Sequence, residues 1–129
     1  MSLYLRICVG DGLFLLDIAH VIEIRRARSL RGAPERMVDL RRLCGAPVLA
    51  EPSCIVVRQE DGRAALLLAD RTQELIELSD DELSPLPPIG ELGELIDAVT
   101  VAAIQERPAL RLRGERLLDA IAAKGASLG

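Results

Sequence analysis

Cysteine, aspartate and histidine, three residue types that often carry chemistry, occur close together early in this 129-residue chain. Cys8, Asp17 and His20 are the types used by hydrolases with a thiol nucleophile. Such a site also needs a tight nucleophile elbow and a glycine turn that stabilises an oxyanion. Neither pattern surrounds Cys8, so we expect no catalysis from these three residues.

The same residue types also argue against a metal site. His20 is the only histidine, and Cys8, Cys44 and Cys54 form no C-x-x-C pair. The sequence contains no glycine-rich phosphate loop and no H-E-x-x-H or G-x-S-x-G motif. We therefore expect a protein that is not an enzyme, with no cofactor and no metal. Three thiols in apolar surroundings, with no disulfide framework, favour a cytoplasmic location.

Charge is unevenly distributed along the chain, whose formal net charge is −4. Arginines crowd one segment: Arg25, Arg26, Arg28, Arg31, Arg36, Arg41 and Arg42. Acidic residues dominate a later one: Asp70, Glu74, Glu77, Asp80, Asp81, Glu82, Glu91, Glu94 and Asp97. Such a dipolar surface suits protein partners or self-association. Ordinary solvated faces are the alternative.

Aromatic side chains are scarce, with Tyr4 and Phe14 the only rings. A small β-barrel that binds nucleic acid stacks bases on such rings. The arginine segment keeps this alternative open, but the lack of rings makes it the weaker one, and we expect no nucleic-acid partner. We also expect no direct membrane insertion, because the longest apolar run, residues 64–69, has only the length of a strand.

Periodic patterns predict a mainly β domain over residues 1–129. Residues 3–9 alternate apolar and polar, a Gly-Asp-Gly turn follows, and residues 13–17 return as a strand that is apolar on both faces and therefore central. Residues 21–26 form a third strand. The same order of hairpin, acidic strand end and following strand recurs over residues 54–59, 64–70 and 73–78, with Asp61-Gly62 as the turn. We interpret this as a weak internal repeat.

Sequence patterns in the last third of the chain predict shorter elements. Ser79 and Glu82 have the spacing of a capping box before a proline-rich loop over residues 83–88. Residues 96–104 and 109–113 are predicted strands, and residues 115–124 a helix.

Several motifs in this order resemble the CheW-like coupling proteins of bacterial chemosensory arrays. Leu30-Arg31-Gly32 and Val38-Asp39-Leu40 look like the family's L-R-G and V-[IV]-D-L signature. Asp39 can also cap the helical turn that follows, through the N–H of Arg41 or Arg42. Val21 to Arg25 matches V-x-E-I-R, and Asp70 ends an apolar strand as in the family. Asp97, where the family usually has glycine, and Arg113, near its acidic position, are departures.

The resemblance implies a CheW-like fold of two small packed five-stranded, SH3-like β-barrels with a short C-terminal helix. It implies a non-catalytic adaptor for a chemosensory, two-component signalling array, which grips the cytoplasmic tip of a chemoreceptor. Carried over by motif, the receptor-binding positions are Val21, Glu23, Leu30, Arg31 and Gly32. The structural signature is Val38, Asp39, Leu40 and Asp70. We expect Glu23 and Arg31 to form an ion pair, with a purely structural pair as the alternative.

One departure concerns the kinase partner. Glu23 and Arg31 are only eight positions apart, and residues 25–29 span at most roughly 17 Å. This connection is too short for the extra strand and helix that family members usually carry there. An accessory protein with weak or no histidine-kinase binding and a full receptor-to-kinase coupling protein both remain open, and other CheW-like proteins are possible partners.

Overall fold

The computed structural model describes residues 1–25, 37–47, 51–87, 93–102 and 107–118. In these residues the fold is mainly β, as predicted, and its strands form a six-stranded and a four-stranded sheet. The strands are β1 (Ser2–Val9), β2 (Gly12–Asp17), β3 (Val21–Arg25), β4 (Met37–Asp39), β5 (Ser53–Arg58), β6 (Ala64–Ala69), β7 (Arg71–Leu78), β8 (Leu83–Pro85), β9 (Ile96–Thr100) and β10 (Ala109–Leu112). The helical turns are η1 (Ile18–His20), α1 (Leu40–Leu43), η3 (Asp80–Glu82) and η4 (Gly114–Arg116).

Each sheet is built around one of the two predicted hairpins. The six-stranded sheet has the order β7-β1-β2-β10-β9-β8, and the four-stranded sheet has the order β3-β5-β6-β4. The first strand of each hairpin pairs antiparallel with an outer strand: β1 with β7, and β5 with β3. The second strand of each hairpin pairs parallel with another strand: β2 with β10, and β6 with β4. Strand β2 is central, as its two apolar faces predicted.

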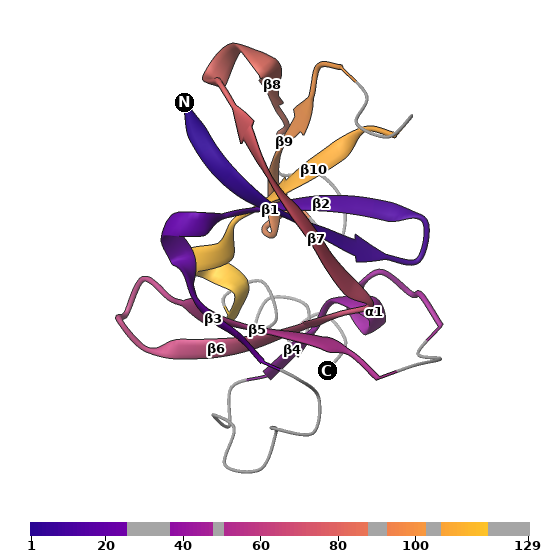
Figure 1. The fold of residues 1–129 in the computed structure, drawn as a ribbon, viewed down its shortest axis with the longest axis vertical. Coiled ribbons are helices and arrows are strands. Elements are labelled where there is room, and N and C mark those ends of the chain that lie inside the picture. The colour runs from indigo at the N-terminus through magenta and orange to yellow at the C-terminus, as the bar shows by residue number, and fades with distance from the viewer. Residues whose placement is uncertain (26–36, 48–50, 88–92, 103–106, 119–129) are drawn as a thin grey trace.

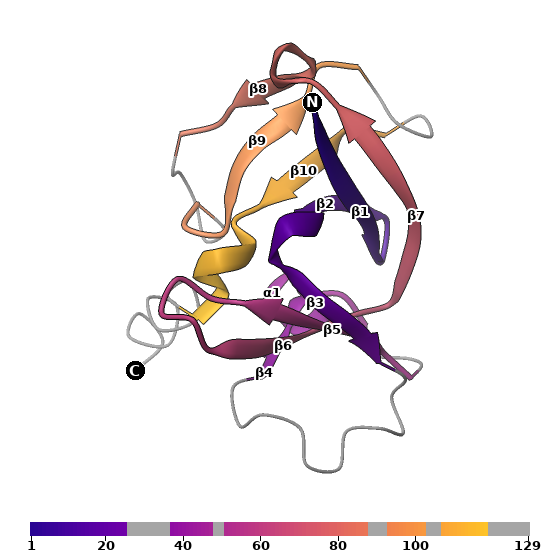
Figure 2. The ribbon, with the colours of Figure 1, turned by 60° about the vertical axis from the view of Figure 1, so that its left-hand side comes forward.

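The two hairpins exchange the strands that follow them. Strand β3 follows the β1-β2 hairpin but pairs with β5, whereas β7 follows the β5-β6 hairpin but pairs with β1. The internal repeat inferred from the sequence thus corresponds to two units that each donate their third strand to the other. Figures 1 and 2 show both chain crossings between the sheets.

Side chains from both sheets share the main hydrophobic core. The six-stranded sheet contributes Ile7 and Leu16, and the four-stranded sheet contributes Ile55 and Leu67, all completely buried. Burying such side chains stabilises the fold by about 1.5–3 kcal/mol each. A second cluster of buried side chains comes from the six-stranded sheet alone and includes Tyr4 and Leu15.

Local signals from the sequence account for most of the turns. Gly62 has a φ of 82°, which glycine adopts without strain, in the turn between β5 and β6. The capping box of Ser79 and Glu82 is present at η3. Apart from shifts of one or two residues at strand ends, two features differ from expectation: β9 ends at Thr100, and residues 83–85 form strand β8 against β9 instead of a loop.

At the C-terminal end, η4 leads into helical residues 117 and 118, and the rest of the predicted helix, to residue 124, lies outside the described residues. Of the helices in the described part of the chain, none is long and apolar enough to cross a membrane.

Candidate functional site

The predicted receptor-binding residue Glu23 lies on β3, an outer strand of the four-stranded sheet. The register shifts between Val21 and Glu23, so Val21 lies opposite Val57 while Glu23 lies opposite Val56. This bulge reverses the normal alternation of side chains. Val21 therefore packs against the shared core, whereas Glu23 lies on the other face of the sheet.

We call this other face, opposite the shared core, the distal face. Its centre is apolar and buried, and consists of Cys54, Val56, Leu66 and Leu68. Its two edges carry charged residues: β3 contributes Glu23 and Arg25, and β4 contributes Asp39 together with the apolar Met37. Glu23 and Arg25 form an ion pair along the strand. The predicted motifs around Glu23 and Asp39 therefore share one face but lie at opposite edges of it.

Apolar side chains accompany Glu23 on β3. Ile22 is 48% exposed and Ile24 is 52% exposed, so two large apolar side chains of one short strand are accessible to a partner. Among the described strands β3 pairs only with β5, which leaves its other edge without a strand partner. Ile24 lies opposite Ile55 and so faces the shared-core side of the sheet, whereas Glu23 faces the distal side. Both lie along an edge that no other described strand covers.

Asp39 has the capping role that the sequence predicted. One of its carboxylate oxygens, Oδ1, accepts a hydrogen bond from the backbone N–H of Arg41 at 3.0 Å. The Arg41 guanidinium donates to both carboxylate oxygens, at 3.1 and 3.2 Å. The hydrogen bond to Asp39 raises the pKa of Arg41, although burial opposes the shift.

Arg41 itself is a residue that sequence reasoning assigned to the wrong environment. Counted there among the surface arginines, its side chain is only 3% exposed. The signal was present, because an arginine two positions after an N-cap aspartate can fold back onto that carboxylate. Val38 and Leu40, on either side of Asp39, are completely buried in the core.

Asp70 occupies the corner where the chain passes from β6 in one sheet to β7 in the other. Its carboxylate oxygen Oδ2 accepts a hydrogen bond from the N–H of Gly10 at 2.6 Å, and its own N–H donates to the carbonyl of Cys8 at 3.0 Å. Gly10, with a φ of 56°, lies in the β1-β2 turn. Asp70 therefore ties the crossing between the sheets to the first hairpin.

The residues weighed as a hydrolase site have structural partners instead. Asp17 caps η1 by accepting from the N–H of Ala19 at 2.9 Å. The Nε2 atom of His20 lies 3.2 Å from the Oε2 atom of Glu115. Cys8 is buried, and no group of three metal-ligating side chains occurs in the described portion of the chain.

Leu30, Arg31 and Gly32, the L-R-G motif, lie outside the described residues. The predicted ion pair between Glu23 and Arg31 is therefore untested, and Arg25 is the partner that the structure gives to Glu23. Arg25 was not predicted from the sequence as the partner of Glu23, although residues two positions apart on a strand lie on the same face and can pair.

Comparison with known proteins identifies the family of this chain. The family model of the CheW-like domain matches residues 28–122. A search of curated proteins finds no match. Among solved structures, the chain is similar to one described as the scaffolding protein TtCheW from Thermoanaerobacter tengcongensis, with a TM-score of 0.71 and 17% identity over 90% of this chain and 91% of that one. Since the family model covers well over half of the sequence, this chain belongs to the CheW-like domain family.

Proposed function

We propose that this chain is a non-catalytic adaptor of a bacterial chemosensory array, and that it binds the cytoplasmic tip of a chemoreceptor through strand β3. Membership of the CheW-like domain family supports the adaptor role. The single observation that carries the surface assignment is the exposure of Ile22 and Ile24 on either side of Glu23. A helical receptor tip offers apolar and charged side chains that match this combination.

The electrostatics of β3 suit a reversible contact. Glu23 and Arg25 are both partly exposed, with side-chain exposures of 46% and 33%, so their ion pair contributes at most about 1 kcal/mol. Exchanging this partner for a charged group of the receptor therefore costs little. Buried isoleucine at the same interface would supply most of the affinity.

Nucleic-acid binding is the weaker alternative. Both rings of the chain, Tyr4 and Phe14, are buried, with exposures of 2% and 4%. Base stacking needs accessible rings. Arg41, one of the arginines of the basic segment, is also not available to a nucleic acid, because its side chain is buried and pairs with Asp39.

Titration of the purified chain against a receptor tip fragment tests the receptor assignment. We expect Glu23→Lys and Ile24→Ser each to weaken binding about tenfold. Glu74→Lys and Leu75→Ser are matched controls, because both residues are exposed on β7 of the other sheet. Arg31→Glu should also weaken capture while leaving thermal unfolding nearly unchanged. Absence of any binding by the unmodified chain would overturn the proposal.

The kinase contact is a separate question. The short connection between Glu23 and Arg31 favours an accessory protein that binds a receptor but docks the histidine kinase weakly or not at all. A full coupling protein is the other candidate. Titration against the regulatory domain of the kinase separates them, since a Kd in the low micromolar range, about −8 kcal/mol, would overturn the accessory role.

A further inference from the structure

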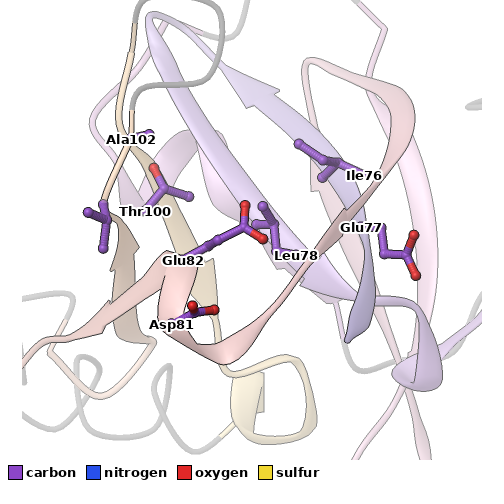
Figure 3. A pocket seen from close by; sticks show the side chains of 8 residues that line it. Ile76, Glu77, Leu78, Asp81, Glu82, Thr100 and Ala102 are labelled. Atoms are coloured by element: carbon purple, nitrogen blue, oxygen red, sulfur yellow. The ribbon is translucent and has the colours of Figure 1, made fainter.

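A groove of about 360 Å³ lies at the end of the six-stranded sheet, away from β3. The described residues that line it come from the end of β7, from η3 and from the end of β9 and the two residues after it: Ile76, Glu77, Leu78, Asp81, Glu82, Thr100, Val101 and Ala102. In Figure 3, Glu82 extends from η3 into the space between Leu78 and Thr100. A groove of this volume can hold one or two large side chains of a partner.

The lining combines an apolar wall with three carboxylates. Ile76, Leu78 and Ala102 are apolar, and Val101 is 69% exposed although it is a large hydrophobic residue. Glu77, Asp81 and Glu82 supply three carboxylates, and no lysine or arginine of the described residues forms an ion pair with them.

Other polar groups of the groove are already satisfied within the chain. The Thr100 hydroxyl accepts from the N–H of Ala109 at 3.0 Å, and the N–H of Val101 donates to the Glu82 carbonyl at 2.9 Å. Glu82 also accepts from the N–H of Ser79 at 3.1 Å. What the groove offers a ligand is therefore mainly apolar surface and negative charge.

We propose that this groove is a docking site for a partner protein segment in which an apolar side chain is flanked by arginine or lysine. The apolar side chain would cover Val101 and Ile76, and the flanking cations would neutralise the carboxylates at the rim. Charge complementarity selects this occupant, because an uncharged apolar segment would desolvate three carboxylates without compensation. The site is separate from the β3 surface of the proposed function and does not depend on it.

NMR titration of the ¹⁵N-labelled full chain tests the proposal, with a short peptide whose central leucine is flanked by arginines as the probe. We expect shifts confined to residues 76–82 and 100–102, and an affinity that falls as salt is added. Peptides with serine in place of the leucine, or glutamates in place of the arginines, should bind at least about tenfold more weakly. Equal binding of all three peptides, or no binding, would overturn the proposal.

Variants of groove residues test where the peptide binds. We expect Val101→Ser to weaken the peptide about tenfold and Glu77→Gln about threefold. The controls Leu75→Ser and Glu74→Gln change exposed residues of β7 that lie outside the groove. Thermal unfolding checks that each variant is folded. Variants that weaken the peptide no more than their controls would overturn the proposal, as would a concentration-dependent dimer abolished by Val101→Ser, because the occupant would then be a second copy.

Discussion

Asp39 and Arg41 are two positions apart, and between them the chain changes from a strand to a helical turn. The carboxylate of Asp39 accepts from one backbone N–H of the turn and from Nε and Nη2 of the Arg41 guanidinium at once. Arg41 is nearly inaccessible to water, and the Asp39 carboxylate is the main group that raises its pKa, with a smaller contribution from Asp70. An aspartate identified in the sequence as part of a family signature thus holds a buried cation in place.

We predict that Asp39→Ala destabilises the protein by about 3 kcal/mol, because it removes both the cap and the carboxylate that the buried Arg41 guanidinium binds. Arg42→Ala is the control. Its side chain is 80% exposed and only reaches Asp39 at 3.8 Å, so its effect should stay within about 0.5 kcal/mol. Urea denaturation measures both, and a loss below 1 kcal/mol for Asp39→Ala would contradict the buried-charge argument.

Cys54 lies beside this pair in the centre of the distal face. Burial raises the pKa of its thiol, and the positive charge of Arg41 only partly offsets that effect. The unfolded chain therefore releases the thiol proton at lower pH than the folded one. The contribution of the neutral Cys54 thiol to the free energy of unfolding is therefore fully present below the pKa of the thiol in the unfolded chain. It is lost as the pH rises toward the pKa of the thiol in the folded chain.

We expect the free energy of unfolding to fall above about pH 8.5, and the fall to be smaller in Cys54→Ala. Subtracting the two pH profiles removes the contribution of all other groups. Cys44→Ala, at a less buried cysteine, serves as the control and should follow the unmodified protein. Identical profiles for Cys54→Ala and the unmodified chain would contradict the prediction.

How far the candidate site could be predicted depended on how local its interactions are. The Asp39 cap involves neighbours in the sequence and was predicted. The orientation of Glu23 depends on a bulge against β5, more than thirty positions away, and was not. The burial of Arg41 requires the distal face to be assembled, so its charge alone indicated a surface residue.

At the scale of elements, Asp70 shows how a strand end is converted into a corner. Strands β6 and β7 are separated by this one residue, and its side chain and backbone both bond to the β1-β2 turn region. The hairpin of one sheet is thereby fastened to the strand connection of the other.

We predict that Asp70→Ala lowers the free energy of unfolding by about 1–3 kcal/mol, since the bond to the Gly10 N–H is charge-assisted. Asp70→Asn keeps an acceptor oxygen and should cost less. Asp11→Ala changes an exposed acidic residue of the same turn and should be nearly neutral. Equal effects of Asp70→Ala and Asp11→Ala in urea denaturation would show that the bond has no role in stability.

Most individual strands were predictable because alternation and turn residues are local signals. The Asp61-Gly62 turn and the Gly-Asp-Gly turn marked both hairpins, and the apolar faces of residues 13–17 marked β2 as central. The pairing of β3 with β5 and of β7 with β1 was not predictable, because partners distant in the sequence are selected by burial in the assembled core. Strand β8 was missed because Pro85 and the prolines that follow it indicate a loop, whereas at a sheet edge a proline needs no ladder partner.

For the whole molecule, the strand exchange has a thermodynamic consequence. Each sheet is complete only when the other is folded. The strand after the β1-β2 hairpin, β3, is an outer strand of the four-stranded sheet, and the strand after the β5-β6 hairpin, β7, is an outer strand of the six-stranded sheet. The shared core contains side chains from both sheets. We therefore expect the two sheets to unfold together, as one cooperative unit.

Two residues report separately on the two sheets. Tyr4, the only tyrosine, is buried in the six-stranded sheet, and Cys54 is buried in the four-stranded one. In a Cys8→Ala, Cys44→Ala background, Tyr4 fluorescence and the thiol reactivity of Cys54 should change at the same urea concentration. Far-ultraviolet circular dichroism should give the same midpoint. Asp70→Ala should lower both midpoints equally, because it weakens the connection on which both sheets depend. Two separate midpoints in the background protein would show that the sheets are independent units despite their exchanged strands.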